Sequence, residues 1–149
     1  MKYITAILFL FLTQATSFSQ DKEEAVRKDL SKLQGSWKLI SGELAGQALP
    51  AGTLSSFSLQ IRDNQYEFRN GQETEKASMV LDPSKNPAHI DFTVTDGSYK
   101  GQKQIGIYQL SDNKVKFCLA QPDDKKRPDT FKTTAENQYM IFEFERVKP

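Results

Sequence analysis

Apolar residues recur at every second position in several separate stretches of this chain, and this spacing is the strongest constraint on its fold. Phe57, Leu59 and Ile61 alternate with polar residues, and the same spacing occurs in residues 90–95, 115–119 and 140–145. Successive side chains of a strand point to opposite faces, so each stretch predicts a strand with one buried face. The expected fold class is therefore all-β.

Turn-forming pairs such as Asn70-Gly71, Asp82-Pro83 and Asp96-Gly97 separate these stretches at short intervals. Residues 121–137 are too polar and too interrupted by proline to predict a strand of similar length. We therefore predict eight strands, at residues 36–44, 55–61, 65–69, 74–81, 89–95, 103–110, 114–120 and 138–147.

Eight antiparallel strands joined mostly by tight turns form a meander, which removes its exposed edges by closing on itself. A two-sheet sandwich is the alternative, but it usually needs long crossing connections, and few links here are long enough. We predict an eight-stranded antiparallel up-and-down barrel over residues 35–149. The interior of such a barrel is either filled by side chains or holds one small ligand.

The first nineteen residues have the pattern of an export signal peptide. Lys2 precedes a short apolar run, Ile4–Leu12, and the small residues Ser17 and Ser19 predict cleavage before Gln20. The run is shorter than the roughly 20 residues of a transmembrane helix, so no stable membrane insertion is expected after cleavage. We expect residues 1–19 to be a leader and the protein to be exported, to a periplasm or to the outside.

A short helix is predicted between this leader and the barrel. In residues 20–34, Val26, Leu30 and Leu33 fall at i, i+4 and i+7, and Gly35 is a natural stop. Such a narrow apolar stripe is marginal alone, so we expect the helix to lie across one end of the barrel.

Charge and composition exclude several classes of function. The chain has 20 Lys and Arg against 19 Asp and Glu, and the densest basic run, residues 125–127, follows two aspartates. A nucleic-acid partner is not expected, because binding phosphates needs a basic excess on one face, and this run is typical of a solvated loop. A single His and a single Cys exclude a site with two imidazole ligands and an internal disulfide. No metal site or cofactor is predicted.

His89 and Cys118 have side chains that are typical of catalytic sites. His89 shares a strand face with Asp91, and such a pair can transfer protons, but a surface histidine at the start of a strand is the favoured interpretation. Cys118 lies on the face opposite Phe117, where shielding by the helix or a loop is favoured over a redox role. No catalytic residue is assigned, and an enzyme is not expected.

Eight aromatic residues project into the barrel if the alternation holds. This lining is typical of an apolar ligand pocket and equally of a filled core, which a domain of this size needs for stability. The tentative ligand-binding residues are Trp37, Phe57, Tyr66, Phe68, Phe92, Phe117, Phe142 and Phe144.

The sequence Gly35-Ser36-Trp37 resembles the Gly-x-Trp signature that opens the first strand of lipocalins. The resemblance implies that Trp37 plugs one end of the barrel and that a basic residue of the closing strand packs over its ring. Arg146 shares a face with Phe142 and Phe144 and fits this role of barrel closure. Thr95-Asp96 and Tyr99 also resemble the second lipocalin motif.

A longer similarity extends over about residues 30–147. The chain resembles a family of exported bacterial lipocalin-like domains that is numerous in planctomycetes, which implies a fold and an export route but no activity. The similar residues include Leu33–Leu39, Leu49-Pro50, Leu81–Lys85, Ile90-Asp91, Gly106–Tyr108, Cys118, Ala120, Pro122, Arg127-Pro128 and Phe131.

Two functions of different classes agree with these features. The first is non-catalytic binding of a small hydrophobic ligand inside the barrel, with a mouth framed by residues 50–52 and 121–130. The alternative is a protein-interaction or inhibitor module of the cell envelope with a packed core, which uses exposed loops such as residues 122–128. The sequence names neither a ligand nor a protein partner.

Overall fold

Neighbouring strands of one sheet pair antiparallel throughout the structure, a computed structural model that describes residues 13–148, and the last strand pairs with the first. Residues 1–12 of the predicted leader lie outside the described residues. The strands of the barrel are β1 (Gly35–Leu44), β3 (Phe57–Arg62), β4 (Gln65–Asn70), β5 (Glu73–Asp82), β6 (Ala88–Asp96), β7 (Lys103–Leu110), β8 (Lys114–Leu119) and β9 (Met140–Arg146). The predicted eight-stranded antiparallel barrel with a lipocalin-like fold is confirmed.

The strand boundaries differ from the predicted ones by more than one residue at two places. A two-residue strand, β2 (Gln47–Ala48), folds back on the end of β1, and a 3₁₀ turn, η1 (Ala51–Ser56), occupies the predicted start of the next strand. The last strand begins at Met140 instead of residue 138, because Gln138 closes a turn with the carbonyl of Thr134 and has a left-handed φ of 55°.

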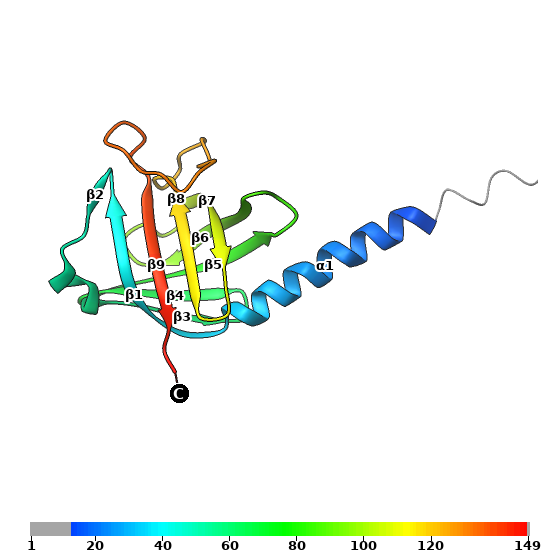
Figure 1. Cartoon of the computed structure of the whole chain (residues 1–149), viewed down its shortest axis with the longest axis horizontal. Coiled ribbons are helices and arrows are strands. Elements are labelled where there is room, and N and C mark those ends of the chain that lie inside the picture. Colours follow the sequence, from blue (N-terminus) through cyan, green and yellow to red (C-terminus); the bar gives the residue numbers. More distant parts are fainter. Residues whose placement is uncertain (1–12, 149) are drawn as a thin grey trace, which may run out of the picture.

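The α-helix α1 (Thr13–Leu33) docks at one end of the barrel and projects away from it (Figure 1). Val26 and Leu30 pack against the core and Leu33 is fully buried, so the predicted apolar stripe is the docking face. The helix begins at Thr13 and so includes residues 13–19, which the sequence analysis assigned to the leader. Within residues 13–148, no helix combines the length and the hydropathy needed to cross a bilayer.

Gly35 makes the transition from helix to barrel. Its φ of +110° belongs to a region that residues with a Cβ rarely adopt, so a glycine turns the chain from α1 into β1. The backbone geometry therefore requires the glycine of the Gly-x-Trp sequence.

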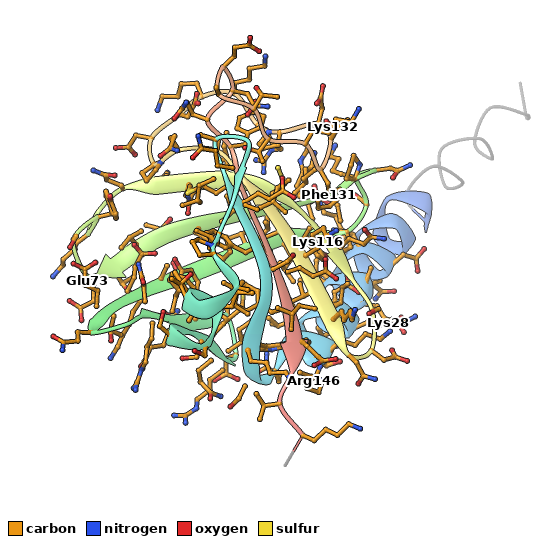
Figure 2. The ribbon with its side chains drawn as sticks, turned by 60° about the vertical axis from the view of Figure 1, so that its left-hand side comes forward. Lys28, Glu73, Lys116, Phe131, Lys132 and Arg146 are labelled. Carbon is orange, nitrogen blue, oxygen red and sulfur yellow. The ribbon has the colours of Figure 1, made fainter. Side chains whose placement is uncertain are left out.

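Buried residues form two clusters, one on each side of the sheet. The larger cluster fills the barrel interior and includes Trp37, Ile90 and Phe117. The smaller one lies on the outer face of β7, β8 and β9, where Ile107 and Cys118 are covered by the connection between β8 and β9 through Phe131. This connection is drawn in orange in Figure 1, and Figure 2 shows Phe131 and Lys132 close to the strands.

Candidate functional site

The end of the barrel next to α1 is closed by a contact between Trp37 and Arg146. The guanidinium carbon of Arg146 lies 4.2 Å from the centroid of the Trp37 ring, within the range of a cation–π interaction. Trp37 pairs with Arg146 in the register of β1 and β9, which places both at the point of closure. The contact predicted from the sequence is confirmed.

Both residues also satisfy carbonyl groups at the end of α1. The Trp37 indole donates a hydrogen bond to the Leu33 carbonyl at 2.9 Å, and the Arg146 guanidinium donates to the carbonyls of Gln34, at 2.6 Å, and Lys32. The last carbonyls of a helix lack partners within the helix and carry its negative dipole end, so a cation there is favourable. Figure 2 shows Arg146 at the end of the barrel where α1 meets the sheet.

The opposite end of the barrel contains a cavity of about 340 Å³. This volume lies in the lower part of the range of small-molecule sites. Seven of the eight aromatic residues predicted to bind a ligand line it: Phe57, Tyr66, Phe68, Phe92, Phe117, Phe142 and Phe144. The eighth, Trp37, is fully buried at the closed end and does not line this cavity.

The aromatic walls form a continuous set of ring contacts. Phe117 lies 6.2 Å from Phe92 and 6.2 Å from Phe144, both in edge-to-face geometry. Phe68 contacts Phe144 at 6.3 Å and Phe57 at 5.9 Å between centroids. These spacings are typical of favourable aromatic pairs, so the rings hold one another while they bound the cavity.

Residues at the strand ends complete the lining and place the mouth. Leu44 ends β1, Met140 begins β9, and Gln121 and Pro122 directly follow β8. Leu49 enters the cavity after the β2 hairpin and packs so closely over Gly42 that a Cβ there would lie 2.5 Å from Leu49 Cδ1. Of the two segments predicted to frame the mouth, residues 121–130 contribute Gln121 and Pro122 to the lining, whereas residues 50–52 do not line the cavity and the preceding Leu49 does.

One polar pair lies within the apolar lining. The Tyr66 hydroxyl donates a short hydrogen bond to Glu75 Oε1. Burial, together with this acceptor and its negative charge, raises the pKa of Tyr66 far above its usual value of 10.0. The hydroxyl therefore stays protonated and remains a donor to Glu75.

Glu75 lines the cavity but was not among the residues predicted from the sequence to bind a ligand. Glu75 lies opposite Phe68 in the register of β4 and β5, so both side chains share the inner face. The pattern contains a clue, because Glu75 alternates in phase with Ala77, Met79 and Leu81, which are all buried. Gln104, Asn70 and Tyr99 are further polar lining residues that were missed.

Arg127 is not part of a solvated basic run, contrary to the prediction. Its guanidinium donates to the carbonyl of Gly106 at 2.6 Å and to that of Ile90 at 3.1 Å, and it forms an ion pair with Asp91 at 2.6 Å. Arg127 thus fixes the β8–β9 connection across β6 and β7, whereas Lys125 and Lys126 are exposed.

His89 and Cys118 both lie close to the β8–β9 connection. Partial burial and the nearby Arg127 charge lower the pKa of His89, which favours its neutral form, and Arg127 instead of His89 pairs with Asp91. Cys118 is fully buried under the β8–β9 connection, and burial raises the pKa of its thiol to about 11. The predicted shielding of Cys118 by a loop is confirmed.

Among the described residues, no three His, Cys, Asp or Glu side chains gather closely enough to hold a metal ion. Comparison of the chain with protein-family models, with curated proteins and with solved structures found no match.

Proposed function

We propose that this protein is an exported lipocalin-like binding protein that holds a small apolar molecule inside its barrel without catalysing a reaction. The proposal includes removal of residues 1–19 on export and membership of the family of exported bacterial lipocalin-like domains that the sequence resembles. One observation carries it: the barrel core is packed at the α1 end but leaves a cavity of about 340 Å³ at the other end.

The character of the lining supports binding. Most of the residues that bound the cavity are aromatic or aliphatic, with a few polar groups at defined places, which is the usual composition of a small-molecule site. Among residues 13–148, no His, Cys, Lys or Arg belongs to the lining, and Glu75 is the one charged residue there. The Tyr66 hydroxyl of this lining is paired with Glu75, but burial and the carboxylate raise the pKa of Tyr66 far above its usual value. A hydroxyl that holds its proton so firmly is a poor nucleophile, which supports a binding role.

The same observation favours binding over the alternative interaction module. That module needs a filled core, and its proposed contact loop is anchored here by Arg127 and the buried Pro128. An empty volume of this kind lowers stability through lost packing contacts. A binding protein needs such a cavity at the open end of its barrel in spite of this loss of stability.

Native mass spectrometry of the protein, purified from its own host without detergent or organic solvent, tests the proposal. We expect a reproducible additional mass that is released on denaturation, and a denatured chain shorter by residues 1–19. A neutral fluorescent probe, N-phenylnaphthylamine, should compete with the released molecule for the same protein. Absence of both the extra mass and probe binding would overturn the binding role.

A pair of matched substitutions locates the binding site. Val94 lines the cavity, whereas Val80 on the neighbouring strand is 69% exposed on the outer face. Val94→Phe should fill part of the cavity and weaken probe binding about tenfold or more, since a ligand and the new ring cannot occupy the same volume. Val80→Phe makes the same chemical change outside the barrel and should leave the affinity unchanged. Equal affinities for both variants would place the probe elsewhere.

A further inference from the structure

We infer that the cavity selects small aromatic or aliphatic molecules that carry a cationic amine, and that Glu75 is the residue that binds the amine. This inference rests on the proposed ligand-binding function and adds to it the chemical class of the ligand. The observation behind it is a single acidic side chain on the wall of an otherwise apolar cavity.

The charge of the cavity lining is negative only. Glu75 is half-buried on the inner face of β5, and no lysine, arginine or histidine of the described residues lines the cavity. Within residues 13–148, Glu75 forms no salt bridge, in contrast to Glu67, Glu143 and Glu145 on the outer face. A partly desolvated carboxylate without a cation is favourable only if a ligand or solvent compensates its charge.

The hydrogen bond from Tyr66 leaves Glu75 able to accept from a ligand. Tyr66 contributes one proton, and that proton is directed to Oε1, whereas an ionised carboxylate has about four acceptor sites. Gln104 donates its amide nitrogen to the Ala120 carbonyl at 2.8 Å, so its amide oxygen is a second acceptor in the lining. Glu75 and Gln104 thus both offer acceptors to the cavity, which match an ammonium donor.

The aromatic walls favour the same ligand. Phe68 lies directly opposite Glu75, and Phe92 contacts the Tyr66 ring at 4.8 Å in edge-to-face geometry. Ring faces attract cations, and this attraction adds to the ion pair with Glu75. A ligand carboxylate would instead meet a like charge in a cavity without a cation, so fatty acids and other organic acids are excluded by the same arrangement.

Three probes of the same shape test the selection in the unmodified protein: phenethylamine, propylbenzene and phenylpropanoate. Their binding is measured by ligand-observed NMR and by competition with N-phenylnaphthylamine. We expect phenethylamine to bind about tenfold or more tightly than propylbenzene, since a hydrogen bond to a charged group is worth at least that factor. Phenylpropanoate should bind most weakly of the three.

Two substitutions and a control assign the preference to Glu75. Glu75→Gln keeps the shape and removes the charge, and it should abolish the advantage of phenethylamine over propylbenzene. Tyr66→Phe removes only the internal donor and should leave this advantage intact or increase it. Glu73→Gln makes the same change in net charge at the exposed start of β5, shown at the edge of the barrel in Figure 2, and should have no effect.

The outcomes separate this inference from the proposed function. If propylbenzene and N-phenylnaphthylamine bind but phenethylamine has no advantage, or if Glu75→Gln preserves that advantage, the inference fails and the binding role stands. If no probe binds and the native protein carries no extra mass, the proposed function itself fails.

Discussion

Replacing Arg146 with alanine is expected to destabilise the protein strongly, although Arg146 lies at the edge of the barrel and does not line the cavity. Its guanidinium joins three parts of the chain: the carbonyls of Lys32 and Gln34 at the end of α1, the Asp112 carbonyl in the β7–β8 turn at 3.2 Å, and the Trp37 ring. Alanine removes all of these contacts at once.

The magnitude follows from the number of groups that lose a partner. A hydrogen bond that involves a charged group contributes about 1.5–3 kcal/mol when it is well shielded. Arg146 is only half-buried, so we take the lower end of this range for the two helix carbonyls. The cation–π contact adds about 1 kcal/mol. The expected loss is about 3–4 kcal/mol, a large part of the 5–15 kcal/mol that stabilises a typical domain.

Urea denaturation followed by Trp37 fluorescence measures this loss, because Trp37 is the only tryptophan of the chain. Arg146→Lys should recover part of it, since an ammonium keeps the charge but cannot reach several carbonyls in a planar fork. Arg62→Ala removes an exposed arginine from β3, which does not pair with β9, and should change the free energy of unfolding by less than about 0.5 kcal/mol. A loss below about 1 kcal/mol for Arg146→Ala would refute the closing role of this residue.

Two further predictions concern the β8–β9 connection and the thiol beneath it. Arg127→Ala should release the connection and increase the rate at which a thiol reagent labels Cys118 in the folded protein, whereas Lys126→Ala, at an exposed position, should leave that rate unchanged; equal rates in both variants would contradict the anchoring. Because burial raises the pKa of Cys118 from 9.0 to about 11, the unfolded thiol loses its proton first, so the free energy of unfolding should fall as the pH rises from about 9 to 11. The decline should be shallower in Cys118→Ala when both are compared by urea denaturation across this range, and identical slopes would show that the thiol contributes nothing.

The strands were predictable because their pattern is local. In β3 and β6, apolar residues alternate with polar ones, so each strand reveals its buried face without knowledge of its neighbours. Closure was predictable from the number of strands and the short turns. The contact between Trp37 and Arg146 was predictable because the two residues belong to the first and last strands, which pair when a barrel closes.

The outer cluster could not be predicted because β7 is buried on both faces. Ile107 faces outward under the β8–β9 connection, and Tyr108 faces inward and donates to Asp29 of α1 at 2.7 Å. Two apolar faces give no alternation, so the sequence leaves the inner face undecided. The partners of Arg127 are equally invisible in the sequence, since they are backbone carbonyls of distant strands.

The sequence leaves open whether the barrel has a filled core or a ligand pocket, whereas the structure has a packed core at one end of the barrel and a cavity at the other. Leu33, Trp37 and Val115 are completely buried near α1, and Arg146 seals that end with hydrogen bonds to the helix. The phenylalanines at the other end line a cavity and contact one another through their rings. Alternation assigns a side chain to the inside but gives no depth along the barrel axis. Depth depends on the strand register and on α1, which covers one end only, so a pattern of inward aromatics cannot separate the residues that stabilise the fold from those proposed to bind.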